Sequence, residues 1–513
     1  MNPMNRIVLA SVLLLLSFPL KAGEEEEVVV DVNRRAQEQA SAVRTVGSFV
    51  FERSAAASFF RQDNAYTELW GQMDWRREDR AFEPAMGDGR LQGAFHVNSY
   101  LRLDKHAVAF AGADYENGQK RNVCWNSTSD FAVLRPYVLA DSVGGDLQRE
   151  QYRFYGGYAR VDGRVNYGIT AAYRAQQEYR EVDPRPRNIT ADLSADLSVG
   201  YLWGPCVVGA AGGLRIYKQQ QSVDFYDPNG ANTSELHFTG LGTFYQRYSG
   251  TTYTSVQYRG TGYHLALTLV PRVHDGWYAL ADYEHLKVDR NLAGTNNTTM
   301  TTLTLQTLTA GLAYRQTSKR FDWGVSFKGA YMLRQGKENV LGSGNNTDHQ
   351  PLLGQMMYDN HGLTVDADGV LTWKRVSGTW SLLPSVVFYR ENEEYAYPHR
   401  KVEVFSLRGG GLAGYTRLYK NWLFDVKAGG YYTANVDGAF VVPLSDTDSR
   451  VYGYVENAYL RRADDWTTLC ADVRVQRKLS SNVAVFVSAA YAKHIYGNNL
   501  QDDNLHVSVG LCF

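Results

Sequence analysis

The chain has 513 residues, of which 44% are hydrophobic and 21% charged, and 53 basic against 54 acidic side chains give a formal net charge of −1. This balance argues against a nucleic-acid-binding protein, which would show a basic excess, and against disorder, which requires low hydrophobicity and high net charge. No apolar run of about 18 residues follows residue 22, which excludes helical membrane spans, and 35 Tyr with 47 Gly favour β-structure.

Residues 1–22 predict a secretory signal peptide. Arg6 gives the charged start, Ile7 to Phe18 the apolar core and Ala22 the cleavage site. We therefore expect the mature chain to be exported and to reside in the outer membrane of a Gram-negative bacterium. The four Cys have spacings that fit neither a zinc site nor a disulfide framework, so no structural disulfide is expected.

Residues 23–64 precede the repeated pattern described next. The acidic run Glu24–Glu27 followed by Val28–Val32 resembles the short apolar energy-coupling box at the start of TonB-dependent transporters. Such transporters carry a plug domain and about 22 strands, and residues 23–64 are too few for that domain. We expect the segment to lie on the periplasmic side or to enter the lumen of the predicted barrel.

Apolar and polar residues alternate from about residue 65 to the end of the chain. Between Ile189 and Tyr201, apolar types occupy every second position, and Thr, Asp, Ser or Gly stand between them. A period of two is typical of a strand and cannot be used by a helix. The same alternation recurs in 165–174, 321–334, 363–374, 422–432, 469–476 and 483–491.

The alternating segments are longer than the five or six residues of an average strand, and their apolar faces often end in Trp or Tyr. Transmembrane barrels need strands of about ten residues, apolar outside and polar inside, with aromatic girdles at both interfaces. The pattern predicts an all-β fold, a transmembrane antiparallel up-and-down β-barrel over 65–513 with about 18 strands; fourteen or sixteen strands stay open. The predicted strands are 65–78, 89–103, 107–117, 150–161, 164–179, 189–203, 206–220, 254–270, 276–289, 300–316, 321–335, 362–375, 379–393, 401–417, 422–436, 465–478, 482–496 and 504–513.

Short and long connections alternate between these strands. Tight turns such as Asp162-Gly163 are followed by long polar loops near 118–149, 221–253, 336–361 and 437–464. This asymmetry is typical of outer-membrane barrels, whose periplasmic turns are short and whose extracellular loops are long.

A barrel of this size normally encloses an aqueous lumen. A lining of both charges gives no clear ion selectivity, and it predicts a porin-like channel or transporter for small polar solutes. Paired charges are also tolerated in a plugged lumen, which leaves open a non-conducting accessory barrel that docks outer-membrane partners or surface ligands through its loops. Strand parity gives these lumen-lining candidates: Arg174, Asp192, Asp196, Lys328, Arg334, Asp366, Asp368, Lys374, Asp425, Lys427, Asp472 and Arg474.

Two stretches offer candidate binding residues in loops. In 183–188 two Pro stiffen the chain beside two Arg, although a rigid connection between strands is the simpler explanation. In 393–398 Tyr stands beside Glu and Pro, a composition that suits contact with a protein or a glycan. The candidate loop residues are Asp183, Arg185, Arg187, Tyr395 and Tyr397.

The last predicted strand, 504–513, alternates strictly and closes on Phe513. An amphipathic strand that ends on an aromatic residue resembles the assembly signal of outer-membrane barrels. We therefore expect the barrel-assembly machinery and outer-membrane lipid as partners of the chain, while an ordinary edge strand is the alternative.

No motif of a known catalytic class is present. The sequence has no Gly-x-Ser-x-Gly, no His-Glu-x-x-His and no phosphate-binding Gly loop. Its 11 His are scattered, and the acidic pairs near 446 and 502 are better explained as solvated loop tips than as calcium sites. We predict that the protein is not an enzyme and has no catalytic residue, metal or cofactor.

Three motifs carry a resemblance to a protein family: Tyr-Arg-Phe-Tyr-Gly-Gly-Tyr at 152–158, Tyr-Arg-Ala at 173–175 and Asp-Pro-Arg-Pro-Arg-Asn at 183–188. With these, the chain resembles a family of uncharacterised outer-membrane β-barrel proteins from Bacteroidota. The resemblance covers the mature chain and implies the fold and the location. The family has no established biochemical role, so the resemblance implies no mechanism.

Overall fold

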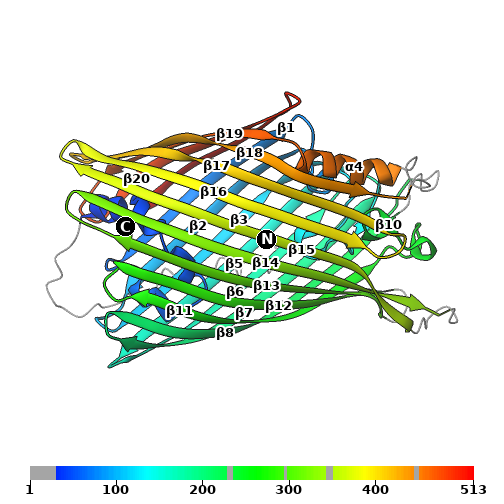
Figure 1. The fold of residues 1–513 in the computed structure, drawn as a ribbon, viewed down its shortest axis with the longest axis horizontal. Coiled ribbons are helices and arrows are strands. Elements are labelled where there is room, and N and C mark those ends of the chain that lie inside the picture. Colours follow the sequence, from blue (N-terminus) through cyan, green and yellow to red (C-terminus); the bar gives the residue numbers. More distant parts are fainter. Residues whose placement is uncertain (1–30, 228–234, 294–296, 343–350, 444–449) are drawn as a thin grey trace, which may run out of the picture.

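The fold is a closed antiparallel β-barrel of 18 strands in a computed structural model (Figure 1), which confirms the predicted fold class. The structure describes residues 31–227, 235–293, 297–342, 351–443 and 450–513, so the predicted signal peptide lies outside the described residues. Each strand pairs with its neighbour in the chain, and β1 pairs with both β2 and β21, which closes the ring. The barrel strands are β1 (Tyr66–Glu78), β2 (Gly89–Arg102), β3 (Ala107–Val123), β5 (Gly145–Asp162), β6 (Val165–Tyr179), β7 (Arg185–Trp203), β8 (Cys206–Asp224), β11 (Val256–Pro271), β12 (Gly276–Leu292), β13 (Thr298–Gln316), β14 (Phe321–Leu341), β15 (Pro351–Arg375), β16 (Gly378–Tyr395), β17 (Arg400–Tyr419), β18 (Trp422–Val441), β19 (Trp466–Lys478), β20 (Ala484–Tyr496) and β21 (Gln501–Cys512).

The period-two pattern gives the barrel an apolar outside. Leu197, Leu214 and Leu265 point outward and are 66%, 70% and 61% exposed. Near the short turns the outer face carries aromatic side chains in contact across strands, with ring centroids 5.0 Å apart for Trp277 and Tyr314. An apolar band bordered by aromatic residues is the surface that a membrane-spanning barrel presents to lipid.

The strands extend further toward the long loops than the alternation predicts. The clearest difference is the predicted loop 336–361, most of which belongs to the paired strands β14 and β15. The prediction failed there because apolar and polar residues alternate only where one face of a strand is apolar. The alternation therefore ends where the strands leave the apolar band. The backbone hydrogen-bond ladder needs no apolar face and continues.

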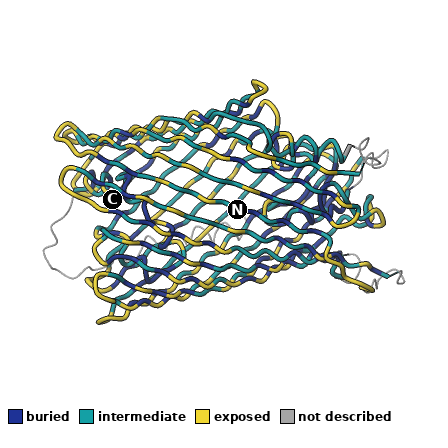
Figure 2. The backbone as a smooth tube through the Cα atoms, in the orientation of Figure 1, coloured by how far each residue is buried: buried dark blue, intermediate teal, exposed yellow. Residues whose placement is uncertain are grey.

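Segments outside the barrel strands lie in both ends of the lumen. At the end with the short turns, called the turn end, lie α2 (Val32–Ala40) and the 3-10 helices η1 (Ala42–Thr45), η2 (Ser48–Val50) and η3 (Ala57–Phe60). At the opposite end, called the loop end, lie η4 (Pro84–Met86), α3 (Phe131–Leu134), β4 (Leu139–Ala140), β9 (Leu236–Gly240), β10 (Thr243–Phe244), η5 (Gln246–Tyr248) and α4 (Arg450–Arg462). Buried backbone gathers at these two ends, while the wall between them is mostly half-buried or exposed (Figure 2).

In the described part of the chain, every helix is too short or too polar to cross a membrane.

Candidate functional site

Residues 31–64, called the turn-end plug, run around the inside of the barrel. Asp31 caps α2 by accepting a hydrogen bond from the Asn33 amide at 2.9 Å. From there the segment follows the wall: α2 contacts β17 to β19, η1 contacts β14 and β15, η2 contacts β11 and β12, and η3 contacts β3, β5 and β11. The plug therefore touches the wall around most of the ring.

The turn-end plug also crosses the mouth. The Arg44 Nη2 donates to the backbone oxygen of Arg61 at 3.1 Å and to the Gln62 side chain at 3.3 Å. Arg44 belongs to η1 on the β14 side, whereas η3, next to Arg61, packs on β3 and β5 at the opposite side of the ring. Burial, together with the neighbouring Arg315 and Arg61, lowers the pKa of Arg44. The plug thus spans the diameter of the barrel.

Small residues in the wall make room for this plug. A Cβ on Gly311 would lie 2.6 Å from the Phe49 ring, and one on Gly324 would lie 2.8 Å from Val46. Both glycines face inward, and the side chains that they admit, Phe49 and Val46, belong to an apolar cluster with Val50 and Val370. The glycines indicate that plug and wall fit each other closely.

Three loops form a second plug at the loop end, here called the loop-end plug: residues 124–144, 235–255 and 450–465. Each contributes one aromatic ring to a stack, in which Trp125 lies 6.2 Å from Phe238 and 5.6 Å from Tyr454, between centroids. Phe238 and Tyr454 are 6.1 Å apart. Strand β4 of the first loop also pairs with β9 of the second. The loops therefore form one packed unit across the mouth.

Arginines of the wall hold the loop-end plug by its backbone. Arg334 donates to the carbonyl oxygens of Arg135 and Ala132, both at 2.8 Å. Arg290, buried on β12, donates to the carbonyl oxygen of Phe238 at 3.2 Å and also to the His237 ring nitrogen Nδ1 at 2.8 Å. Arg334 was predicted to line the lumen; it faces inward, but it lies beneath this plug and is 4% exposed.

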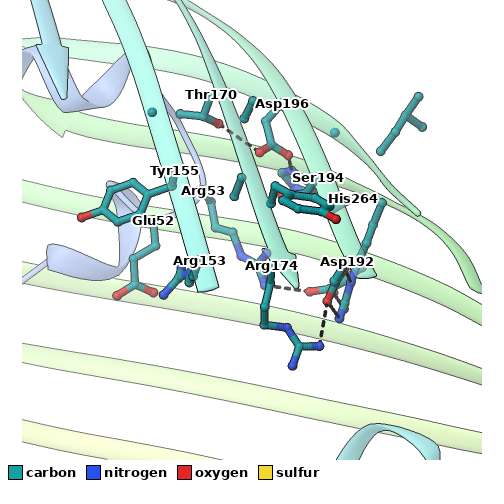
Figure 3. Close-up of a pocket in the computed structure, with 18 of the residues that line it drawn as sticks. Glu52, Arg53, Arg153, Tyr155, Thr170, Arg174, Asp192, Ser194, Asp196 and His264 are labelled. Atoms are coloured by element: carbon teal, nitrogen blue, oxygen red, sulfur yellow. Dashed lines mark hydrogen bonds and ion pairs between the residues drawn. The ribbon is translucent and has the colours of Figure 1, made fainter. Parts of the chain in front are cut away.

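A cavity of about 980 Å³ lies between the two plugs (Figure 3). Its wall comes from β5 to β8 and from β11 and β12, its floor from residues 48–61 of the turn-end plug, and its cover includes Asp130 and Val133 of the loop-end plug. We call this cavity the chamber. Its lining is rich in charged side chains of both signs.

A chain of ion pairs begins in the loop-end plug and continues along the chamber wall. The Arg174 Nη1 donates to Asp130 Oδ1 at 2.9 Å, and its Nη2 lies 3.4 Å from Asp192 Oδ2. Arg215 binds Asp192 with both Nε and Nη2, at 2.9 and 2.8 Å. The Arg174 interaction with Asp130 lowers the pKa of that carboxyl group although burial opposes the shift.

The chain continues from Arg215 to the turn-end plug. The Arg215 Nη1 lies 3.7 Å from Glu284 Oε1, and Arg53 of the plug donates to Glu284 Oε2 at 2.8 Å. The Arg53 Nε lies 3.1 Å from Asp282, whose other oxygen is 3.2 Å from His264 Nδ1. Ion pairs thus connect the two plugs through the chamber wall.

The lumen-lining candidates all lie on the inner face of their strands, but they do not form one site. Arg174, Asp192 and Asp196 line the chamber, where Asp196 accepts from Thr170 at 3.0 Å and lies 2.7 Å from His264 Nε2. The others face the lumen from further around the ring or lie near the turns. Ion pairs join Lys374 to Asp322 at 2.7 Å, Lys427 to Asp425 at 3.0 Å and Arg474 to Glu68 at 2.5 Å, while Lys328, Asp366, Asp368 and Asp472 occupy inward positions of β14, β15 and β19.

Of the five loop candidates, Asp183 and Tyr397 lie in connections as predicted, whereas Arg185, Arg187 and Tyr395 belong to strands. Arg185 and Arg187 belong to strand β7, because the chain resumes its ladder with β8 directly after Asp183-Pro184. Asp183 accepts from the amides of residues 226 and 227, at 2.6 and 2.7 Å, which organises the connection. Tyr395 is buried and donates to Glu338 at 3.0 Å, so it offers no surface contact; Tyr397 is 79% exposed.

Several residues of the chamber and of its ion pairs were not predicted from the sequence. Arg215, His264, Asp282 and Glu284 follow the same inward parity and could have been found by extending it to every predicted strand. Arg53 and Asp130 lie outside the strands, where no periodic signal exists. The described residues contain no group of three or more His, Cys, Asp or Glu side chains arranged to hold a metal ion.

Comparisons with known proteins give a family but no activity. No curated protein matches the sequence. A solved mutant of the ferric enterobactin receptor from Pseudomonas aeruginosa matches at 8% identity and a TM-score of 0.37, over 88% of this chain and 81% of that chain. The ferric preacinetobactin receptor from Acinetobacter baumannii matches at 9% identity and a TM-score of 0.36, over 88% and 79%. A bacterial polysaccharide outer membrane secretin matches at 12% and 0.36, over 88% and 97%. None of these structural similarities is high enough to carry an argument about function.

The family described as "Family of unknown function (DUF6850)" has a model that matches residues 54–513, which is most of the sequence. The match covers the whole barrel and the last part of the turn-end plug. This chain is therefore a member of the DUF6850 family.

Proposed function

We propose that the protein is a gated barrel of the outer membrane, closed in the conformation described here, that admits a small polar solute to its chamber when a plug moves. The observation that carries this proposal is a charged chamber held between two plugs. An open porin does not fit, because packed segments cross both mouths. The proposed role includes no catalysis and no cofactor.

The orientation follows from the connections. Short turns belong to the periplasmic side and long loops to the cell surface in barrels of this type, so the loop-end plug would face the outside. The apolar band supports the location, and the signal peptide at residues 1–22 is part of the proposal. An origin in Bacteroidota stays a prediction.

Two charged side chains at the chamber that could bind a solute indicate its chemical class. Arg153 is half-exposed at the chamber, and its nearest carboxylate is that of Asp114 at 4.0 Å. Glu52 reaches the same chamber from the turn-end plug (Figure 3). In the described part of the chain, Arg153 has only this long ion pair and Glu52 has none, so a cation on the wall and an anion on the plug are available to a zwitterionic solute.

The chain of ion pairs gives a reason for coupling between solute and plugs. Asp130 of the loop-end plug and Arg53 of the turn-end plug are the two ends of the same chain. A solute that binds Asp192 or Arg215, in the middle of the chain, would weaken the ion pairs that hold Asp130 and Arg53. Such a ligand shifts the plug equilibrium by the difference between its affinities for the closed and open forms.

Conductance in planar bilayers tests the proposal. The substitution Arg53→Glu places a third carboxylate beside Asp282 and Glu284 and should expel the turn-end plug from the wall. Arg34→Glu is the matched control, since it reverses a charge in the same segment on an exposed side chain. We expect no steady conductance from the wild type or from Arg34→Glu, and stepwise conductance from Arg53→Glu. A wild type that conducts steadily would contradict the gated barrel.

Liposome swelling then tests the solute class. With Arg53→Glu in the membrane, swelling in zwitterionic solutes should be faster than in anions or cations of the same size. Equal rates for all three would remove the argument from Arg153 and Glu52 while leaving the gate itself in place.

The second candidate is a non-conducting accessory barrel. One observation favours it: the hairpin of β14 and β15 projects at the loop end (Figure 1), with Val340, Leu352 and Leu353 exposed by 54%, 73% and 60%. Apolar side chains this exposed in a water-facing hairpin are typical of a contact surface. If neither the wild type nor Arg53→Glu conducts, and a protein that co-purifies with the wild type is lost on Leu352→Lys, the accessory role is favoured.

A further inference from the structure

Four cationic side chains lie together on the outer face of the barrel near the loop end: Arg187 on β7, Lys218 on β8, Arg259 on β11 and Lys287 on β12. All four are exposed. They have the same outward parity as the exposed Ile189, Leu214, Leu265 and other apolar residues of these strands. We call these four side chains the cation row.

The register brings three members of the row close to one another and places Arg187 further toward the loop end. Lys218 and Arg259 are direct partners in the β8–β11 ladder. Lys287 is the partner of Thr261, two residues along β11 from Arg259. Lys218 is also the partner of Ala191, so Arg187 stands four residues nearer the loop end on β7. Direct partners have Cβ atoms about 5 Å apart, so Lys218, Arg259 and Lys287 can reach one ligand.

The row has little compensation from carboxylates. Among the described residues no ion pair involves Arg187, Lys218 or Arg259, and Arg259 donates only to the Gln257 side chain at 3.1 Å. Two carboxylates of the same outward parity lie nearby. Asp289, the ladder partner of Arg259, accepts from Thr302 at 2.6 Å and lies 3.6 Å from Lys287. Asp224 stands two residues along β8 from Ser222, the ladder partner of Arg187. Four positive charges thus face two negative charges, and Lys218, Arg259 and Lys287 have only Asp289 among them.

Outward cations on another part of the ring behave differently. On β16 and β17, Arg390 lies 2.5 Å from Glu403, and Lys401 lies 3.0 Å from the same carboxylate. Those cations are balanced by the protein itself. The cation row on β7 to β12 therefore differs from the paired outward cations of β16 and β17.

The position of the row relative to the apolar band defines what it faces. On the turn-end side of the row, Ile216 and Tyr263 are exposed by 48% and 42%, and Leu214 and Leu265 follow further down. Acyl chains would cover these side chains, which places the row at the level of the lipid headgroups. Cationic side chains at that level gain from anionic lipid headgroups.

We propose that the cation row binds the phosphate groups of an anionic lipid in the outer leaflet, with its acyl chains lying on the apolar surface below. Phosphate oxygens accept hydrogen bonds from Arg and Lys and would neutralise the row. From the proposed function, the inference takes only the orientation with the loop end outward. It is independent of whether the barrel conducts.

Lipid binding to the purified full-length protein tests the inference. The probes are bis-phosphorylated lipid A and its dephosphorylated form, titrated into the protein in neutral detergent and followed by native mass spectrometry. The test variant combines Lys218→Gln, Arg259→Gln and Lys287→Gln. The matched control combines Arg390→Gln and Lys401→Gln, which removes outward cations that the protein already pairs.

We expect the wild type and the control variant to bind the phosphorylated lipid with similar affinity. The test variant should bind it roughly 10- to 100-fold more weakly, and none of the proteins should favour the dephosphorylated form. A third variant, Lys218→Arg with Lys287→Arg, keeps the charge and should bind like the wild type. Heat-modifiable migration in gel electrophoresis shows that each variant is folded.

Two results would overturn the inference. One is equal affinity of the wild type for the phosphorylated and dephosphorylated lipids, which would mean that the phosphates are not recognised. The other is equal loss of binding in the test and control variants, which would mean that total charge matters and the row does not. Conductance enters neither result, so a failure here is distinguishable from a failure of the gated barrel.

Discussion

Replacing Arg53 by Met should release the turn-end plug from the chamber wall. Arg53 is the only residue of this plug that joins the chain of ion pairs in the described part of the protein. Its substitution leaves Asp282, which is 1% exposed, with His264 as its remaining ion-pair partner at 3.2 Å. The methionine keeps most of the side-chain volume, so the change tests charge and not packing.

The size of the effect follows from burial. Removing one partner of a buried ion pair costs about 3–5 kcal/mol, whereas an exposed pair contributes about 0–1 kcal/mol. The Arg53 side chain is 33% exposed and His264 still compensates Asp282 in part. We therefore expect docking of the plug to lose about 2–3 kcal/mol, which raises the undocked population roughly 30- to 150-fold.

Hydrogen exchange of residues 48–60, measured by mass spectrometry, reports this population. Arg53→Met should speed exchange in that segment, and Arg34→Met, an exposed substitution in the same plug, should leave it unchanged. In the background of Asp282→Asn, where the buried negative charge is absent, Arg53→Met should cost at least about 1 kcal/mol less. Unchanged exchange in Arg53→Met, or an effect that Asp282→Asn does not reduce, would refute the role of the ion pair.

Three further outcomes are expected at the loop end. Trp125→Ala removes two of the three ring contacts that join the loops and should weaken the loop-end plug by about 2–4 kcal/mol. Proteolysis within 235–255 should become faster, and an unchanged cleavage rate would contradict the role of the stack. Gly336→Ala places a Cβ against the hydroxyl end of Tyr137 and should speed hydrogen exchange in 131–140. Gly329→Ala, whose added Cβ would have no neighbouring atom within 4 Å, should leave that exchange unchanged. Equal effects of the two substitutions would contradict the argument. Burial raises the pKa of Glu235 to about 8. The folded plug therefore keeps a proton on this carboxyl group that the unfolded segment loses near pH 4.3. The stability of the plug falls as the pH rises between these two values. Glu235→Gln should abolish that fall in exchange measured from pH 5 to 9, and a parallel pH profile in both proteins would show that another group titrates.

The wall of the barrel was predictable because each strand residue faces either lipid or lumen. Segment 189–203 was predicted from its strict alternation, and it forms most of β7. The same parity placed Arg174, Asp192 and Asp196 on the inner face, where they line the chamber. Successive strand positions face lipid and lumen in turn, so the polarity of each residue indicates which of the two it faces.

The prediction weakened where the strands leave the membrane. Tyr395 was predicted as a loop residue available to partners, but it ends strand β16 and is buried beneath the loop-end plug. Above the apolar band, the inner face is covered by folded loops and the outer face meets water. Polar and apolar residues are then tolerated on both faces, so alternation no longer predicts where a strand continues or which way a side chain points.

The sequence by itself determined the barrel: its class, its strands, their direction and which face each side chain takes. Only the tertiary structure decided that the lumen is crossed at both ends, because Arg53, Trp125 and Asp130 lie in segments without periodicity. Their positions depend on contacts with residues far away in the chain, such as Arg53 with Glu284 and Trp125 with Tyr454. Local patterns record the solvent that a strand meets, whereas the packing of loops into a closed lumen depends on the shape of the completed ring.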